Sequence, residues 1–279
     1  ENLIKISLPE TAYMLGYLWA DGNVIKDRNG IKMVIDINDA NMIKSIMLKV
    51  IPWKIVSEYS KQNNKYYSRF YIYDKRIKEF FVNNDYLIKS GASACKILSK
   101  IPIQLHCYWW RGYFDGDGCF CFNTNSRGIC SVSRVSLVAC FHQDWLFLIK
   151  LFKRLKISFK IIRIKTKLGN SSVVRFAGYV SICRFYKYIY AGVIFGLDRK
   201  RNIFLEYFNY KNDKKNNKKC KYIGVTIEKR NKFKKYVARI SYKNKLLRLG
   251  YFYKAEDAAI AYNEMAIKLY QEKAQLNIV

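Results

Sequence analysis

The chain has 279 residues, of which 51% are hydrophobic, and its 51 Lys and Arg residues against 21 Asp and Glu residues give a net charge of +30. So much apolar sequence excludes a disordered chain, and the length predicts about two domains. No apolar run approaches the roughly 18 residues of a membrane span. The charge predicts a polyanionic partner, with nucleic acid as the first candidate and an anionic membrane surface as the second. Of these we expect nucleic acid and no membrane.

Two stretches of the chain predict the same succession of elements, which gives an α+β fold. Each begins with an apolar helix, continues with two strands, an amphipathic helix and two further strands, and closes with helical segments rich in Phe, Ile and Tyr. Two units in one register indicate an internal duplication. The expected elements span residues 11–20, 23–26, 32–37, 40–50, 54–59 and 67–73 in the first stretch, and 106–115, 119–122, 134–141, 145–156, 159–167 and 171–177 in the second.

Composition divides the chain into four segments. Residues 1–100 and 101–208 hold the two repeats, and residues 222–279 form a small module for which we expect three strands and one helix. Between them, residues 209–221 contain six lysines and one acid, a composition that predicts a solvated basic linker.

The two apolar helices end in related motifs, LGYLWADG at residues 15–22 and RGYFDGDG at residues 111–118. Each helix carries two small residues four positions apart, which form a smooth stripe on one face. Two such stripes let helix backbones approach closely, and the plainest interpretation is a tight interface between the repeats. The pairs are Gly16 with Ala20 and Gly112 with Gly116.

The aspartates of these motifs are poorly placed unless a cation lies between them. Asp21 and Asp117 stand at helix C-termini, where the helix dipole disfavours a carboxylate by about 0.3–1 kcal/mol. Pairing the helices would add repulsion between the two charges. Mg²⁺ suits carboxylates combined with phosphate, and such ions catalyse phosphodiester hydrolysis. The pair therefore predicts a metal-dependent nuclease, and the alternative is a duplicated scaffold that only binds DNA.

The motifs resemble the two signatures of LAGLIDADG homing endonucleases, through MLGYLWADG at 14–22 and WRGYFDGDG at 110–118. The resemblance covers both repeats and implies a monomer whose two pseudo-symmetric αββαββα repeats form a saddle on double-stranded DNA. It implies that Asp21 and Asp117 share two or three Mg²⁺ ions, with the backbone carbonyls of Ala20 and Gly116 as secondary ligands. Trp19 replaces an earlier aspartate of the family pattern, which is not the essential ligand in that family.

Four further residues have positions at which the resemblance implies active-site roles. Lys89 and Lys200 follow the last strand of each repeat, where the family often places a catalytic lysine. The alternative is that these lysines bind phosphate or cap helices. Asp39 and Gln143 lie at strand-to-helix turns, where the family positions a water-organising residue.

DNA contacts are expected from strand faces, because a two-stranded ribbon fits the major groove. In RIKTK at 163–167, alternation places Arg163, Lys165 and Lys167 on one face, and we expect Arg175 to continue that face on the next strand. The other candidates on the strands are Asn23, Lys32, Asn123 and Arg134.

The C-terminal module resembles the DNA-binding domain of the APETALA-two and ethylene-response-factor regulators. The similarity rests on YIGV at 222–225, VARI at 237–240, LGYF at 249–252, AAIAYN at 258–263 and AQLN at 274–277. It implies that a three-stranded sheet packed on one helix lies against DNA. The plant target is not carried over, because Ile223, Thr226 and Glu228 stand where the plant proteins carry DNA-contacting arginines.

Strand alternation separates the two faces of this small sheet. We expect Tyr236, Ala238 and Ile240 to face the helix. The residues expected on the outer, DNA-facing side are Val237, Arg239 and Ser241, joined by Arg248 on the third strand.

The cysteines favour a reduced, intracellular protein. The eight cysteines include no CxxC pair, and two histidines are too few to complete zinc sites with them. Most lie among apolar residues and are expected to be small core residues. The composition leaves open whether the compartment is an organelle, a phage- or virus-infected cell or a bacterial cytoplasm.

The leading hypothesis is a homing endonuclease that makes a staggered break in a long asymmetric DNA site and so promotes the mobility of its host intron or element. The alternative on the same scaffold does not cleave: a maturase with intron RNA as partner, or a DNA-binding regulator. The presence of both Asp21 and Asp117 favours cleavage. An HNH nuclease needs a histidine base, and His106 and His142 both lie inside the repeats, which argues against that class.

Overall fold

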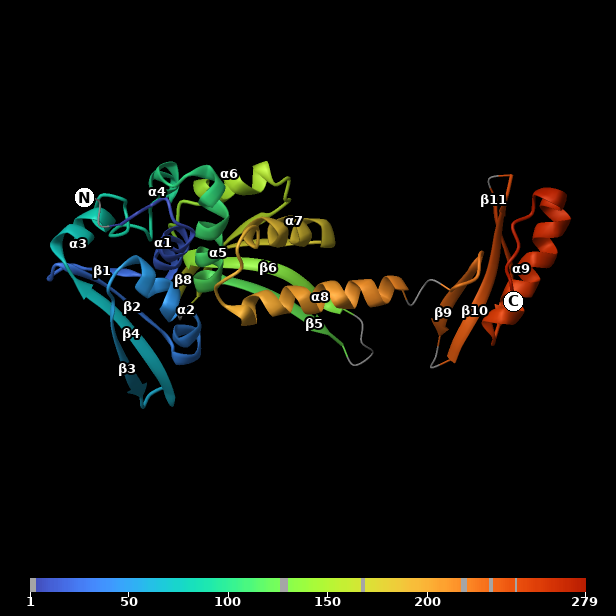
Figure 1. Cartoon of the computed structure of the whole chain (residues 1–279), viewed down its shortest axis with the longest axis horizontal. Helices are drawn as coiled ribbons and strands as arrows, with labels where there is room; N and C mark the ends of the chain where they lie inside the picture. The colour runs from blue at the N-terminus through green and yellow to red at the C-terminus, as the bar shows by residue number, and fades with distance from the viewer. Residues whose placement is uncertain (1–3, 126–129, 167–168, 217–219, 231–232, 244) are drawn as a thin grey trace. The chain divides into compact units, whose positions relative to one another are not determined.

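The computed structural model describes residues 4–125, 130–166, 169–216, 220–230, 233–243 and 245–279 (Figure 1). The chain divides into two compact units, Glu1–Phe204 and Leu205–Val279. Among the described residues, no helix is both long and apolar enough to cross a membrane.

The first unit contains two copies of the predicted αββαββα order, so the α+β prediction is confirmed. In each copy a buried helix precedes two strands, a second helix, two more strands and a third helix. The first copy comprises α1 (Pro9–Asp21), β1 (Asn23–Ile25), β2 (Gly30–Asp36), α2 (Ile37–Val50), β3 (Lys54–Ser60), β4 (Lys65–Tyr73) and α3 (Lys75–Val82). The second comprises α5 (His106–Asp117), β5 (Gly118–Thr124), β6 (Cys130–Cys140), α6 (Leu146–Arg154), β7 (Lys160–Thr166), β8 (Gly169–Ala177) and α7 (Tyr179–Ile189). Short helices α4 (Cys95–Lys100) and η1 (Ile103–Leu105) join the copies, and α8 (Asp198–Asn216) follows them.

Each copy builds one antiparallel four-stranded sheet, in the orders β1-β2-β4-β3 and β5-β6-β8-β7. Because side chains alternate along a strand, one face of each sheet carries the core, with Met33 and Phe70 in the first sheet and Val135 and Val174 in the second. The opposite face, called the outer face below, is open to solvent and is the surface on which a ligand could lie.

The register corrects one prediction about the second sheet. Arg175 pairs with Lys160 and Ser136, which puts it on the outer face, whereas Arg163 pairs with the fully buried Ser172 on the core side. The prediction that Arg175 continues the face of Arg163 is therefore wrong, because a one-residue difference in register moves a side chain to the other face. Lys167 lies outside the described residues.

Helices α1 and α5 lie side by side in the first unit and bring the two copies together (Figure 1). A Cβ on Gly16 would stand 1.9 Å from the Trp109 carbonyl oxygen, and a Cβ on Gly112 would stand 2.0 Å from the Tyr13 carbonyl oxygen. These helices therefore touch backbone to backbone, as the small-residue stripes predict. The contact is possible only because both positions lack a side chain.

The second unit has the predicted three strands and one helix. Strands β9 (Val225–Arg230), β10 (Phe233–Tyr242) and β11 (Lys245–Phe252) form a sheet in the order β11-β10-β9, and α9 (Ala255–Tyr270) is followed by η2 (Gln271–Lys273). Alanines make the close packing of α9 on the sheet possible, because Ala258 and Ala259 are fully buried against Ala238. Gly224 has a φ of +72°, and a Cβ there would meet the Tyr262 ring at 2.1 Å, so this turn requires glycine.

Two expectations around this unit need correction. Val237, expected on the outer side, is fully buried, because it lies on the central strand between its register partners Thr226 and Tyr251. Residues 209–216, expected to begin a linker, continue α8, since this stretch contains no proline or glycine that would end a helix.

Candidate active site

The two motif aspartates are the last residues of α1 and α5 and converge there. A Cβ on Gly116 would lie 2.3 Å from the Ala20 Cβ and 3.2 Å from Oδ2 of Asp21. The last turn of α5 therefore lies against the last turn of α1, and each carries its aspartate to the same end of the helix pair. The predicted convergence of Asp21 and Asp117 is thus present in the structure.

The negative charges of Asp21 and Asp117 are only partly compensated by neighbouring positive charge. Burial, followed by the charge of Asp21, raises the pKa of Asp117 to about 7. Burial among protein atoms also raises the pKa of Asp21, although that side chain keeps solvent exposure, while Lys89 and Lys200 lower it. The two lysines therefore compensate the acids only in part, and a further cation at this point would relieve the remaining repulsion.

The two lysines approach the pair from opposite copies. The Lys89 ammonium donates to the Ala20 carbonyl oxygen at 2.6 Å and to the Leu18 carbonyl oxygen at 3.2 Å, and burial lowers its pKa to about 8. Lys200 donates to the Gly118 carbonyl oxygen, and burial lowers its pKa as well. Both ammonium groups cap carbonyls at the ends of the motif helices, one of the roles considered for them, and both remain within electrostatic range of the aspartates.

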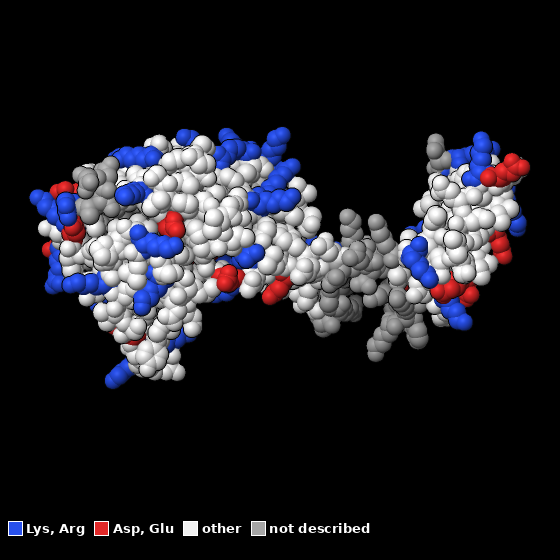
Figure 2. All heavy atoms as spheres, in the orientation of Figure 1, with Lys and Arg blue, Asp and Glu red and all other residues white. Residues whose placement is uncertain are grey.

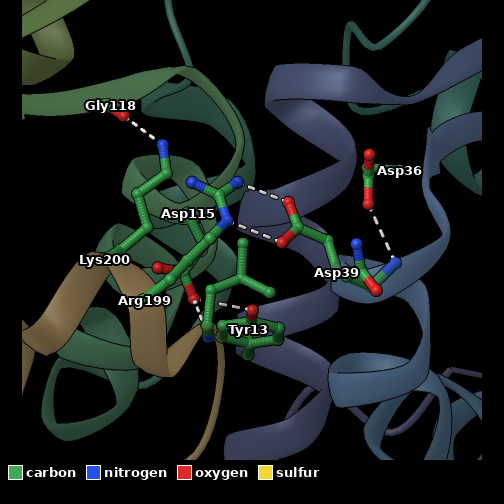
Figure 3. A network of polar contacts seen from close by, with 9 residues as sticks. Tyr13, Asp36, Asp39, Asp115, Gly118, Arg199 and Lys200 are labelled. Carbon is green, nitrogen blue, oxygen red and sulfur yellow. Dashed lines mark hydrogen bonds and ion pairs between the residues drawn. The ribbon is translucent and has the colours of Figure 1, made fainter. Parts of the chain in front are cut away.

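Asp39 and Gln143 lie deeper and reach across between the copies. Both oxygens of Asp39 accept hydrogen bonds from the Arg199 guanidinium, with Nε to Oδ1 at 2.7 Å (Figure 3). Gln143 donates from Nε2 to the Ala92 carbonyl oxygen at 2.5 Å. The structure therefore places each strand-to-helix residue of one copy against the lysine-bearing segment of the other.

Sequence reasoning did not find the residues that hold these segments. Asp115 is fully buried and accepts a hydrogen bond from the Tyr13 hydroxyl at 2.7 Å and from the Leu197 amide at 2.9 Å (Figure 3). Arg111, also fully buried, donates to the carbonyl oxygens of Ile189 and of residues 191 and 193. The sequence did contain a signal for these two residues. A charged residue inside an apolar helix needs a polar partner when it is buried, so each could have been predicted to bind a distant segment.

The outer face of the first sheet is polar and aromatic. Asn23 and Lys32, both predicted to contact DNA, are exposed there and pair with each other in register. Sequence reasoning missed their neighbours, which line a hollow on this face. These neighbours are Arg28, Glu58, Arg69, Tyr71 and Tyr73, with an ion pair of 2.7 Å between Arg69 and Glu58.

The outer face of the second sheet has a different composition. Arg134, Lys160 and Arg175 line one hollow, and Asn123 is exposed on β5. Ile162 and Ile164 share this face and are half-buried. The predicted Arg163 and Lys165 lie elsewhere, with their cationic groups 5.6 and 5.4 Å from the centre of the Phe141 ring.

In the second unit, the residues predicted to contact DNA are partly engaged within the protein. Arg239 forms an ion pair with Glu228, and Arg248 donates to the Tyr251 hydroxyl at 2.7 Å. Ser241 is exposed. Figure 2 shows Lys and Arg side chains spread over both units on the face in view, with acidic side chains among them on each unit.

The donor set fits a hard divalent cation shared with a ligand. Within the described ranges, no group of three or more His, Cys, Asp and Glu side chains could hold a metal ion, so these residues form no closed metal cage. Two carboxylates alone leave coordination positions for water and phosphate oxygens, which is the arrangement Mg²⁺ prefers. Asp21 and Asp117 supply such a pair, whereas the Ala20 carbonyl, expected as a secondary ligand, accepts a hydrogen bond from Lys89.

No protein-family model matches the sequence, and no curated protein matches it. Among solved structures, the chain is similar to the I-LtrWI LAGLIDADG homing endonuclease bound to target DNA, with 13% identity and a TM-score of 0.46 over 74% of this chain and 91% of that one. It is also similar to I-DmoI in complex with DNA and Ca, with 14% identity and a TM-score of 0.44 over 66% and 90% of the two chains. A third structure is the N-terminal LAGLIDADG domain of DUF199/WhiA, with 15% identity and a TM-score of 0.42 over 68% and 87%.

Proposed function

We propose that this protein is a Mg²⁺-dependent endonuclease that cuts both strands of a DNA duplex. The observation that carries the proposal is the convergence of Asp21 and Asp117 at one end of a glycine-packed helix pair, with the half-buried Lys89 and Lys200 beside them. Two acids with raised pKa values are costly in a structural interface, and a divalent cation would remove that cost. The excess of Lys and Arg over Asp and Glu supplies the attraction for the phosphate backbone.

In the proposed mechanism, Asp21 and Asp117 would hold the metal in their ionised forms. A divalent ion held there would polarise the phosphate and supply a nucleophile by lowering the pKa of water. Lys89 and Lys200 place positive charge beside the scissile phosphates. Burial lowers the pKa of Lys89 to about 8, so its ammonium would give up a proton more easily than that of an exposed lysine.

The substrate proposed for this site is long and asymmetric. The outer faces of the two sheets carry different side chains, tyrosines with Arg69 on one and isoleucines with Arg175 on the other, so the two halves of a duplex site would be read differently. We further propose that the C-terminal sheet contacts DNA through Arg248 and Ser241, and that the break serves to move the host intron or element, as the resemblance to LAGLIDADG enzymes implies.

The test is cleavage of a randomised duplex library in the presence of Mg²⁺, with sequencing of the product ends. We expect the wild-type protein to give defined staggered ends and the Asp21→Asn and Asp117→Asn proteins to give none. Enrichment of bound DNA without cut ends, equal in all three proteins, would instead indicate a binding protein. Retention of RNA in a parallel library would then favour a maturase.

A further inference from the structure

The cross-repeat contacts of Asp39 and Gln143 follow one plan. Asp39 is the third residue of α2 in the first copy, and its partner Arg199 lies in the first turn of α8 after the second copy. Gln143 precedes α6 in the second copy, and its partner Ala92 lies in the segment after the first copy. Each copy thus holds the segment that follows the other.

These segments carry the two lysines. Arg199 directly precedes Lys200, and the nearby Leu197 amide donates to Asp115 of α5 at 2.9 Å. The turn that presents Lys200 is therefore fixed by two carboxylates, one from each copy. Figure 3 shows both attachments, together with Lys200 directed to the Gly118 carbonyl.

The segment that presents Lys89 is also fixed at two points, by different chemistry and, for one of them, at a different distance from the lysine. Tyr86, three residues before Lys89, packs its ring 5.0 Å from that of Trp19 and donates to the Leu15 carbonyl oxygen at 2.8 Å. Ala92, three residues after Lys89, accepts from Gln143. Trp19 and Asp115 hold equivalent motif positions, so ring packing in one copy replaces a buried carboxylate in the other.

The two partners of the Asp39–Arg199 contact differ in solvent exposure. The Asp39 side chain is 10% exposed and the Arg199 side chain 55% exposed, so replacing Arg199 opens no cavity in the core but removes the charge that compensates the Asp39 carboxylate. The bidentate geometry fixes the direction of Arg199 as well as its distance. Loss of this contact would loosen the Lys200 turn and leave the Lys89 segment untouched.

We infer that Asp39 and Arg199 form a cross-repeat brace that positions Lys200 for cleavage of one DNA strand, and that Gln143 does the same for Lys89 and the other strand. Asp39 and Gln143 are then positioning residues, acting through the segments that they hold. The inference rests on the proposed nuclease function. It makes each half of the site dependent on the opposite copy, so that both copies must be docked before either lysine is in place.

Strand-resolved cleavage tests the inference. A plasmid carrying one site selected from the library is cut under single-turnover conditions, and the two strands are followed with separate labels. Lys200→Met and Lys89→Met identify which strand each lysine serves. We expect Arg199→Gln to slow the same strand as Lys200→Met by about tenfold or more, with the other strand within about twofold, so that nicked plasmid accumulates.

Matched variants separate positioning from general damage. Gln143→Ala should slow the strand that Lys89 serves, and Arg76→Gln, which breaks the exposed ion pair with Asp74, should slow neither strand. Arg199→Lys keeps the positive charge but cannot donate two parallel hydrogen bonds to Asp39. This variant should therefore cleave faster than Arg199→Gln and more slowly than the wild type. DNA affinity measured in Ca²⁺ should be the same for Gln143→Ala, Arg76→Gln, Arg199→Lys and the wild type.

The outcomes are distinct. Equal slowing of both strands by Arg199→Gln, or slowing of neither, would overturn the brace while leaving the nuclease proposal in place. A wild-type protein that binds the site and cuts neither strand would remove the proposed function, and the brace's role with it.

Discussion

The backbone contact between α1 and α5 makes a strong prediction for Gly112→Ala. The new Cβ would stand 2.0 Å from the Tyr13 carbonyl oxygen and 2.8 Å from the Tyr17 nitrogen. Both neighbours are backbone atoms, so no side-chain rotation can relieve the contact. The helices would have to separate by roughly 1 Å or more before ordinary packing is restored.

The expected loss of stability follows from two opposing contributions. Overpacking in a well-filled interior costs about 1–3 kcal/mol and occasionally more, and this contact against backbone belongs at the upper end. Replacing glycine by alanine in a helix returns about 1 kcal/mol. We therefore expect the free energy of unfolding to fall by about 2 kcal/mol, which for a unit of this size lowers Tm by roughly 4–8 °C.

Urea unfolding followed by tryptophan fluorescence measures this change in the first unit alone, because all five tryptophans precede residue 205. Gly91→Ala is the matched control, since a Cβ at Gly91 has no heavy atom within 4 Å. The control should stay within about 0.5 kcal/mol of the wild type. If Gly112→Ala proves as stable as the control, the close approach of the two helices is refuted.

Three further predictions concern the pKa of Asp117, the second sheet of the first unit and the sheet of the second unit. The folded-state pKa of Asp117 is raised to about 7, so the native protein holds a proton that the unfolded chain releases above about pH 4. Without divalent ions, the free energy of unfolding should therefore fall as pH rises from about 5 to 7. Urea titrations should show a smaller fall in Asp117→Asn, and an unchanged fall would count against the repulsion between Asp21 and Asp117. Replacing thymine by uracil under the second sheet should weaken binding by up to about fourfold per methyl group that touches Ile162 or Ile164, measured in Ca²⁺ by fluorescence anisotropy, whereas equal effects in both half-sites would contradict the assignment. Finally, Arg248→Ala should reduce the slope of log affinity against log salt by about 1 if this arginine holds a phosphate, and an unaltered slope would exclude that contact.

The repeat architecture was predictable because its signals are local. Alternation in strands such as 67–73 and the paired small residues of the motif helices fix which face is buried, and the duplicated Asp-Gly ends fix which acids meet. The same holds for α9, whose alanines at 258 and 259 specify a helix packed flat on a sheet.

The polar connections were not predictable, since they depend on register and on distant segments. Asp39 and Arg199 are separated by 160 residues, and Tyr13 and Asp115 by 102 residues, so no sequence period relates them. The assignment of Arg163 and Arg175 to one face failed for a related reason. Alternation orders residues within one strand, whereas the pairing between strands decides which faces join.

The most direct test of the proposed chemistry is the single-turnover rate of Mg²⁺-dependent cleavage at the selected site. Wild type is compared with Asp21→Asn and Asp117→Asn, in each case with DNA affinity measured in Ca²⁺. We predict that each substitution lowers the cleavage rate of both strands by about 100-fold or more while the DNA is still bound. A wild-type rate in either variant would contradict the claim that these two aspartates hold the metal that cuts DNA.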